Sequence, residues 1–417
     1  MSFVARAGGA AVALAVGLAV VPAAAAHAVR AAVPIDCTVA ALRQAINDAN
    51  NGGGGTIDLA PKCTYTLTDA NTVGGPNGLP EITTAITLNG DKKTVIERSS
   101  AAGTPAFRFF EVLGPNGDLT LNRLTLRNGS AGNGGAILVQ GGAELAVNAS
   151  HLTDNHAGGD GGAINGRPGG STVTVTSSSV KKNSAGNGGG GIVAFGSLSL
   201  SRTEVSENTA RIAGGVGVQN ATATLSHSEV KGNTATGAAT GTSGGGGVAL
   251  VSATATLNST SVTKNKATGS GADGGGIRDV GGSTLNLRSS RVSGNTATDQ
   301  GGGIFSQNVL NVRSSTIEDN TAVNQGGGVW NSGTARFDVT VLKGNKTTAA
   351  GSLGGGLFNG AGTAALHSSK VIKNSAVADG GGVYETPGTT VTANQTDFER
   401  NRPNNCAPNG AVAGCVG

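Results

Sequence analysis

The chain is poor in charged and aromatic residues, and this narrows its possible functions. Charged residues make up 13% of its 417 residues and aromatic residues 3%, and the formal net charge is +4. A nucleic-acid binder would show a concentrated basic face, so we expect no nucleic-acid partner. Hydrophobic residues still make up 37% of the chain, which leaves enough apolar surface for a folded core.

Long hydrophobic runs are confined to the start of the chain. An apolar run over residues 10–21 follows Arg6, and the small-x-small tripeptide Ala26-His27-Ala28 comes shortly after it. This pattern is typical of a secretory signal peptide and is too short for a membrane span, so we assign residues 1–28 to a signal peptide. We expect a secreted, extracellular protein without membrane insertion, because no later segment is apolar enough to cross a bilayer.

Cysteine is also scarce, and its four copies lie near the two ends of the chain: Cys37, Cys63, Cys406 and Cys415. In an exported protein this placement predicts two local disulfides, Cys37–Cys63 and Cys406–Cys415. Metal ligation is the alternative, but neither pair is accompanied by a histidine or a second thiol pair at ligand spacing.

Glycine, in contrast, is abundant and periodic. There are 72 glycines, and GG or GGG followed by Ile, Val or Leu recurs with a downstream Asn-x-Ala. The shortest spacing between successive anchor asparagines is 25 residues. Self-similarity at such a period predicts a solenoid. The anchors are Asn155, Asn183, Asn208, Asn233, Asn265, Asn295, Asn320, Asn345, Asn374 and Asn401.

Residues at fixed offsets from these anchors specify the architecture. An apolar residue stands three positions before nearly every anchor and another eight before it, and Ser or Thr stands five before it. Period-2 runs such as Thr284-Leu285-Asn286-Leu287 predict strands with one buried face. We therefore expect an all-β fold, a single right-handed parallel β-helix of about 12–13 coils, with three short strands and three bends in each coil. Asn tolerates a left-handed corner, and its amide can bond the next coil.

The two ends of the chain differ from the repeats. Thr38 can cap a helix that places Leu42 and Ile46 on one side, and a glycine run ends it, so we expect an N-terminal capping helix. We divide the rest into a cap with irregular first coils (29–127), regular repeats (128–401) and a disulfide-closed tail (402–417). We expect a monomer.

The motifs Gly134-Gly-Ala-Ile137 and Gly161-Gly-Ala-Ile164, with their GGG variants, resemble those of exported bacterial right-handed parallel β-helix proteins with polymorphic outer membrane protein-type repeats. The segment from Cys37 to Ile46 resembles the CSLREA-like start of many such proteins, although it carries an extra Ala and has Gln for Glu. The resemblance implies a pectin-lyase-like β-helix that is exported and often surface-associated or adhesive. Its motif is structural and carries no catalytic residues. Gly214-Gly-Val-Gly217 departs from the motif and is expected to place Gly217 at the apolar position.

Many β-helices of this shape cleave acidic polysaccharides, which requires clustered carboxylates with a basic residue. The nearest approach is Asp273, Asp279 and Asp299 with Arg278. Asp273 and Asp299 precede GG motifs in adjacent coils and are expected to share a column at the corner. We favour polar turns for them, with catalysis or Ca²⁺ bridging as the alternative. No other cofactor is expected.

Two histidines are candidate metal ligands. His151 and His156 lie on either side of Asn155, so they could bind a metal ion. Nothing in the adjacent coils repeats them. We favour solvated corner residues.

The strongest functional candidate is a column of large side chains. The residue after the apolar position of the GG motif is Arg278, Phe305, Trp330, Phe358 and Tyr384 in five successive coils. Strand alternation would point this column outward as an exposed ladder, with Asp279, Asn331, Asn359 and Glu385 one position further on. Such a stripe could stack on sugar rings or on peptide. Alternatively the rings fill the core, since earlier coils place Leu138, Val193, Val218 and Ala249 there.

These observations favour a secreted, non-enzymatic β-helix scaffold that binds a polysaccharide or another cell-surface ligand. The alternative is a polysaccharide lyase or glycoside hydrolase that acts on acidic polysaccharides and uses residues near Asp273, Asp279 and Asp299.

Overall fold

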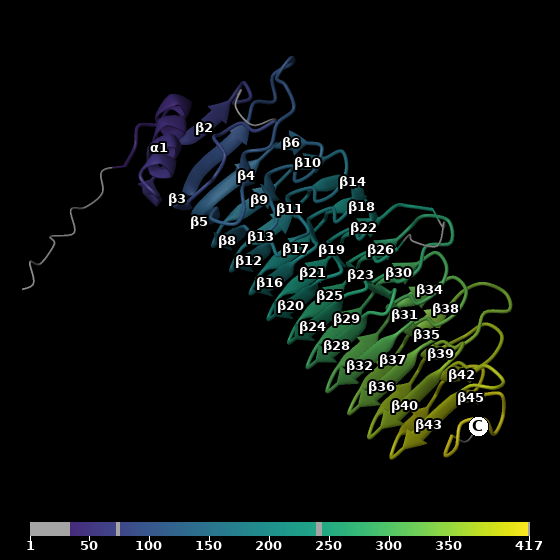
Figure 1. The fold of residues 1–417 in the computed structure, drawn as a ribbon. Helices are drawn as coiled ribbons and strands as arrows, with labels where there is room; N and C mark the ends of the chain where they lie inside the picture. The colour runs from purple at the N-terminus through teal and green to yellow at the C-terminus, as the bar shows by residue number, and fades with distance from the viewer. Residues whose placement is uncertain (1–33, 72–75, 239–243, 416–417) are drawn as a thin grey trace, which may run out of the picture. The chain divides into compact units, whose positions relative to one another are not determined.

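The structure is a computed structural model that describes residues 34–71, 76–238 and 244–415. From Pro34 onward the chain forms one compact unit. The predicted signal peptide lies outside the described residues. Figure 1 shows the coils stacked in chain order, from α1 and the first strands to β45, with loops projecting along one side. The right-handed parallel β-helix expected from the repeat is confirmed.

Three parallel sheets run along the β-helix. Among the described residues one sheet has 24 strands, one has 12 and one has 9. The 12-stranded sheet is crossed once in each coil, which agrees with the expected number of coils. Its strands are β4 (Phe110–Val112), β7 (Ile137–Val139), β11 (Ile164–Gly166), β15 (Ile192–Ala194), β19 (Val216–Gln219), β23 (Val248–Val251), β27 (Ile277–Val280), β31 (Ile304–Ser306), β35 (Val329–Asn331), β39 (Leu357–Asn359), β42 (Val383–Glu385) and β45 (Cys406–Ala407).

The 24-stranded sheet takes two strands from each regular coil. Its strands are β1 (Gly55–Asp58), β2 (Thr64–Leu67), β3 (Ala85–Arg98), β5 (Asp118–Arg127), β8 (Glu144–Asn148), β9 (His151–Thr153), β12 (Thr172–Thr176), β13 (Ser179–Lys181), β16 (Ser197–Ser201), β17 (Glu204–Ser206), β20 (Thr222–Ser226), β21 (Glu229–Lys231), β24 (Thr254–Asn258), β25 (Ser261–Thr263), β28 (Thr284–Arg288), β29 (Arg291–Ser293), β32 (Val309–Arg313), β33 (Thr316–Glu318), β36 (Thr334–Asp338), β37 (Val341–Lys343), β40 (Thr363–His367), β41 (Lys370–Ile372), β43 (Thr390–Asn394) and β44 (Asp397–Glu399).

The 9-stranded sheet is narrow, because most of its strands have only two residues. Its strands are β6 (Ser130–Ala131), β10 (His156–Ala157), β14 (Ser184–Gly188), β18 (Thr209–Ile212), β22 (Thr234–Ala235), β26 (Lys266–Ala267), β30 (Thr296–Ala297), β34 (Thr321–Ala322) and β38 (Lys346–Thr347).

A regular coil therefore holds four strands, not the three that we expected. In one coil β31 is followed by β32, β33 and then β34, which begins directly after Asn320. The extra strand β34 holds the alanine of the Asn-x-Ala motif, and Ala322 is fully buried. The sequence pattern misses this strand because two residues are too few to show a period.

The anchor asparagines form a continuous ladder inside the β-helix. The Asn295 amide nitrogen donates to Asn320 Oδ1 at 2.9 Å and to the Val262 carbonyl oxygen at 2.9 Å. The amide ladder is confirmed, but the expectation that Asn adopts the left-handed conformation is wrong. The preceding residue has positive φ in every regular coil, for example 53° at Asp319 and 64° at Gly294. The buried Asn is then free to use its side chain for bonds between coils.

The N-terminal helix closes one end of the core. α1 (Val39–Asn51) is capped by Thr38, whose Oγ1 accepts from the Ala41 backbone N–H at 3.1 Å, and ends at Gly52. Leu42 and Ile46 are fully buried in the main hydrophobic cluster. The helix therefore covers the apolar end of the first coils, which would otherwise be open to water.

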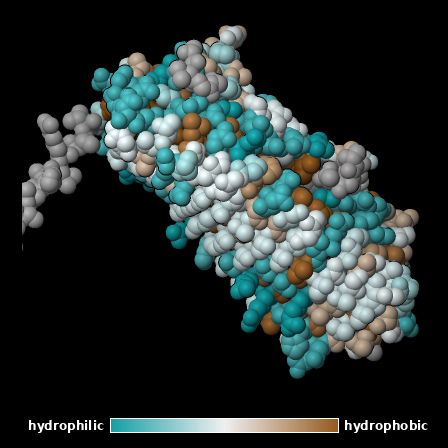
Figure 2. All heavy atoms as spheres, viewed as in Figure 1, coloured by the Kyte–Doolittle hydropathy of each residue, from teal (hydrophilic) through white to brown (hydrophobic). Residues whose placement is uncertain are grey.

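The structure contains both expected disulfides, Cys37–Cys63 and Cys406–Cys415. The first joins the residue before the N-cap of α1 to the residue before β2, and the second lies in the tail after β44. No helix among the described residues is long and apolar enough to cross a membrane. On the face seen in Figure 2, hydrophobic side chains are scattered and form no continuous patch.

Candidate functional site

The 12-stranded sheet presents two columns of side chains whose surroundings differ. Ile304 pairs in register with Ile277 and Val329, and all three belong to the main hydrophobic cluster. The next residue of each strand points away from that cluster because side chains alternate along a strand. This outward column includes Val193, Gly217, Ala249, Arg278, Phe305, Trp330, Phe358 and Tyr384.

Two expectations about this column are wrong at β19. Val216, not Gly217, holds the apolar position, because it pairs with Ile192 and Val248 and is fully buried. Gly217 therefore lies in the outward column, where we had expected Val218. The motif keeps its apolar residue, and it is the outward side chain that is missing from this coil.

The four rings of the outward column form a continuous stack. The centroids of Phe305 and Trp330 are 4.3 Å apart, those of Trp330 and Phe358 6.5 Å, and those of Phe358 and Tyr384 5.5 Å. The guanidinium carbon of Arg278 lies 5.7 Å from the Phe305 centroid and caps the stack. We name these four rings the ring column.

The ring column points outward, but it is not the exposed ladder that we expected. Phe305 is 3% exposed and Phe358 7%, and only Trp330 and Tyr384 are partly exposed. Each ring is covered by its neighbours in the stack and by the glycine turn before its strand. A Cβ on Gly354 would lie 2.6 Å from the Cβ of Phe358, so this turn folds closely against the outward side chain.

The residues one position further on were expected beside the ladder, but they point into the β-helix. Asp279, Asn331 and Asn359 are fully buried and Glu385 is 7% exposed. Asn331 Nδ2 donates to Asn359 Oδ1 at 2.7 Å. Because these side chains point away from the outer face, the inner column offers no contact to a ligand bound there.

A groove of about 350 Å³ opens on the outer face where the outward column has small side chains. Gly217 of β19 and Ala249 of β23 form its floor, between Val193 of β15 and Arg278 of β27. We call it the β19 groove. It exists because two successive coils lack the large outward side chain that covers this face in the coils of the ring column.

The walls of the β19 groove are mixed in character. Phe195 and Gln219 line one side, and Asn187 and Arg211 line the other. The Arg211 Nη2 donates to Asn187 Oδ1 at 2.9 Å, and the Asn187 amide nitrogen donates to Asp160 Oδ1 at 2.8 Å. These bonds hold a charged and an amide side chain at the rim of the groove.

The carboxylates expected to form a pair are arranged differently. The backbone N–H of Gly274 donates to the Gln300 carbonyl oxygen, so the counterpart of Asp273 in the next coil is Gln300 and not Asp299. Asp299 Oδ1 instead accepts from the Asn324 amide at 2.7 Å. Asp160 and Asp379 do occupy the corner column of Asp273, since each accepts the equivalent backbone bond.

Asp273 and Asp279 both have raised pKa values. Burial, together with the nearby charge of Asp299, raises the pKa of Asp273 to about 7, although Arg278 and the Gln300 backbone N–H oppose the shift. Burial raises the pKa of Asp279 to about 6, although the hydrogen bond from Ser306 opposes the shift. Burial also lowers the pKa of Arg278, and Asp273 opposes that change.

The two histidines are not brought together as a metal site. His151 Nδ1 lies 2.8 Å from Ser179 Oγ, and His156 Nδ1 lies 2.9 Å from Ser184 Oγ. Each histidine thus contacts a serine in the next coil, and the two stand in different sheets. The described residues contain no cluster of His, Cys, Asp and Glu suited to a metal ion.

No protein-family model matches this sequence, and no curated protein matches it either. Among solved structures, the surface adhesin PfbA of Streptococcus pneumoniae is 10% identical, with 88% of each chain covered and a TM-score of 0.39. The tailspike protein of E. coli bacteriophage HK620, solved with a pentasaccharide, is 12% identical, covers 91% of this chain and 77% of its own, and has a TM-score of 0.41. Likenesses this distant do not bear on what this chain binds.

Proposed function

We propose that the protein is an exported, non-enzymatic β-helix that binds a saccharide in the β19 groove. The observation that carries this proposal is the gap in the outward column at Gly217 and Ala249, which leaves a groove of about 350 Å³ on an otherwise filled face. Binding sites for small molecules are concave and mainly apolar, with a few polar groups in their lining. The β19 groove has this composition.

The groove walls match the chemistry of a sugar ring. A pyranose has an apolar face of C–H groups, which can pack against the ring of Phe195 and the floor at Ala249. Its hydroxyl groups both donate and accept hydrogen bonds. The amides of Gln219 and Asn187 and the guanidinium of Arg211 supply partners at the rim.

A binding screen tests the proposal. The purified protein is titrated calorimetrically with soluble polysaccharides and their short fragments. Ala249→Phe should fill the groove and weaken binding by about tenfold or more. Residue 249 occupies the same column as Phe305, two coils earlier, so the new ring would cover the outer face there as Phe305 does in its own coil. Phe195→Ala should weaken binding by a similar factor through lost packing on the sugar face.

The matched control is Ala365→Phe, which adds the same ring at a partly exposed position of β40 in the 24-stranded sheet. This variant should bind as the wild type does. Equal affinity of wild type and Ala249→Phe for every saccharide bound would contradict the proposal, as would the absence of binding to all of them.

One observation favours the enzymatic alternative: Asp273, with a pKa of about 7, lies close to Asp299 and to Arg278 at the end of the groove. A carboxyl group with such a pKa can act as a general acid near neutral pH. Incubation with pectate and alginate, with and without Ca²⁺, separates the two functions. New reducing ends or unsaturated products that Asp273→Asn abolishes would establish the enzyme and overturn the non-enzymatic scaffold.

A further inference from the structure

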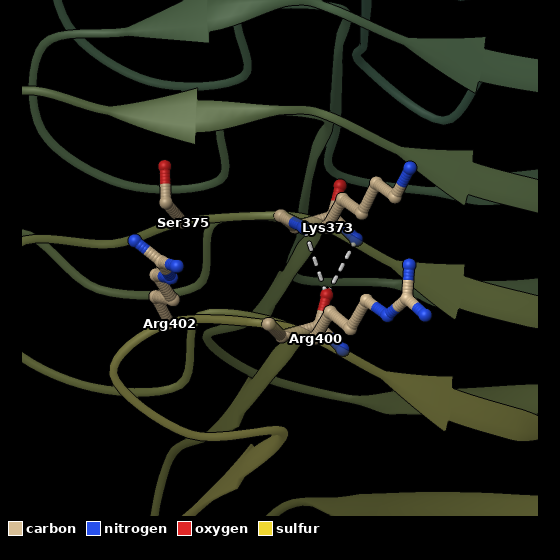
Figure 3. Close-up of a pocket in the computed structure, with 6 residues that line it drawn as sticks. Lys373, Ser375, Arg400 and Arg402 are labelled. Atoms are coloured by element: carbon tan, nitrogen blue, oxygen red, sulfur yellow. Dashed lines mark hydrogen bonds between the residues drawn. The ribbon is translucent and has the colours of Figure 1, made fainter.

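A second feature lies far along the chain from the β19 groove, at the Asn corner of the last regular coils. Lys373, Arg400 and Arg402 line a depression of about 590 Å³ together with Ser375 and the stacked amides of Asn374 and Asn401. Figure 3 shows the side chains of Lys373 and Arg400 extending in the same direction from neighbouring coils. Arg402 lies on the other side of the corner, beside Ser375.

The charges of this cluster are not balanced as they are at the same corner of an earlier coil. Lys181 Nζ lies 3.0 Å from Glu207 Oε1, where Glu207 occupies the corner position equivalent to Lys373. Among the described residues, none of the three cations of the cluster forms an ion pair. The neighbouring carboxylate of Asp397 pairs with Lys370 at 3.7 Å, and the Glu399 side chain is exposed on the adjoining strand β44.

The backbone at Arg400 adds a hydrogen-bond donor. In earlier coils the N–H of this left-handed corner residue donates to the next coil, as Asp319 does to the Lys343 carbonyl oxygen and Lys373 to that of Glu399. The N–H of Arg400 has no acceptor within the described part of the chain. Like its counterparts, this N–H points away from the preceding coil, so it can donate to an oxyanion bound beside Arg400.

We propose that Lys373, Arg400 and Arg402 form a binding site for an acidic polysaccharide. Its carboxylate or sulfate groups would contact the two cations on one side of the corner and Arg402 on the other. Arginine forks and a lysine ammonium both recognise such oxyanions. The lining of the depression contains no aromatic ring on which a base could stack, so single-stranded nucleic acid fits this surface less well.

The proposal is independent of the β19 groove and is tested with the full chain. Binding is measured with heparin as a sulfated probe, polygalacturonate as a carboxylated probe, dextran as a neutral probe and a single-stranded DNA oligonucleotide, each at low and high NaCl. The test variant carries Lys373→Glu, Arg400→Glu and Arg402→Glu. The control is Lys264→Glu, which reverses an exposed charge at the equivalent corner position, where φ is 55° against 56° at Lys373.

The triple variant should bind at least one acidic polysaccharide about tenfold or more weakly, while Lys264→Glu changes the affinity less than about twofold. Binding of the wild type should weaken with salt, and dextran should not compete.

Unchanged affinity of the triple variant, or an equal loss with Lys264→Glu, would overturn the site. Tighter binding to the oligonucleotide than to either polysaccharide would overturn the choice of ligand. Ala249→Phe should leave this binding unchanged, so the failure of either site is distinguishable from that of the other.

Discussion

At the scale of single residues, Asp273 determines how the corner beside the β19 groove responds to pH. Its pKa is about 7 in the folded protein, against 3.8 when exposed to water. The folded state therefore holds a proton that the unfolded state releases above pH 3.8. Stability must fall as pH rises through this window and level off above about pH 7.

Replacing Asp273 by Asn should remove this dependence. We expect wild type to lose about 2–4 kcal/mol of stability between pH 4 and pH 8 that Asp273→Asn retains, because an amide does not ionise. Denaturant unfolding at several pH values measures the difference. Asp279 has a pKa of about 6 and adds a similar slope to both proteins, so only the difference between them reports on Asp273. Parallel stability profiles would show that the Asp273 carboxyl group is not buried as described.

The ring column belongs to the stability of the molecule, although its position had suggested a binding surface. Trp330 stacks between Phe305 and Phe358, so Trp330→Ala should lower the free energy of unfolding by about 3 kcal/mol. Saccharide affinity should stay the same. Val339→Ala, at a side chain that is 58% exposed, is the control and should cost far less. If Trp330→Ala lost saccharide affinity without losing stability, the ring column would be the binding site.

At the scale of elements, the Asn ladder couples each coil to the next. Asn295 receives bonds from the backbone N–H and the amide of Asn265, and donates to Val262 and Asn320. Asn295→Ala should cost about 3–5 kcal/mol, because several buried groups lose their partners together. Asn401→Ala, in the last coil, should cost about 1–2 kcal/mol because solvent can reach that end.

Thermal unfolding and hydrogen exchange measure these effects. Asn311→Ala is the control, since Asn311 also bonds an asparagine of the neighbouring coil, Asn286, but does so on the outer, partly exposed face. Its cost should be below about 1 kcal/mol. Similar costs at Asn295 and Asn311 would mean that burial of the ladder contributes nothing.

Most of these elements could be predicted from the sequence, because a repeated column reports the same environment many times. The Ser or Thr five residues before each anchor, for example, marks a repeated position in the sequence. In the structure this position joins adjacent coils, since Ser290 Oγ accepts from the Thr260 backbone N–H at 3.1 Å. Features that do not repeat as a pattern were missed. The left-handed residue before Asn is Asp, Lys, Glu, Arg or Gly, and this variety hides the single backbone conformation that they share.

At the scale of the whole molecule, regular coils build the scaffold and departures from regularity build its surface features. The β19 groove arises at Gly217 and Ala249, and the basic cluster arises where the last coils carry Lys373 and Arg400. The unusual glycine at position 217 was visible in the sequence. Its meaning was not, because assigning the glycine to the inner or the outer face required the register of β19 with β15 and β23.

The groove walls could not have been found from the sequence. Phe195 and Arg211 are 16 positions apart in the chain, and Phe195 follows β15 whereas Arg211 lies in β18. They meet only because successive coils stack and one corner faces the outer side of the 12-stranded sheet. Short-range patterns predict the strands, whereas a site made between coils needs the stacking itself.

A crystal structure of the protein with a short fragment of the saccharide that it binds best would locate the binding site directly. We expect the sugar to lie over Gly217 and Ala249, with one face against Phe195 and its hydroxyl groups near Arg211. A sugar stacked on Trp330 and Tyr384, with the β19 groove empty, would contradict it.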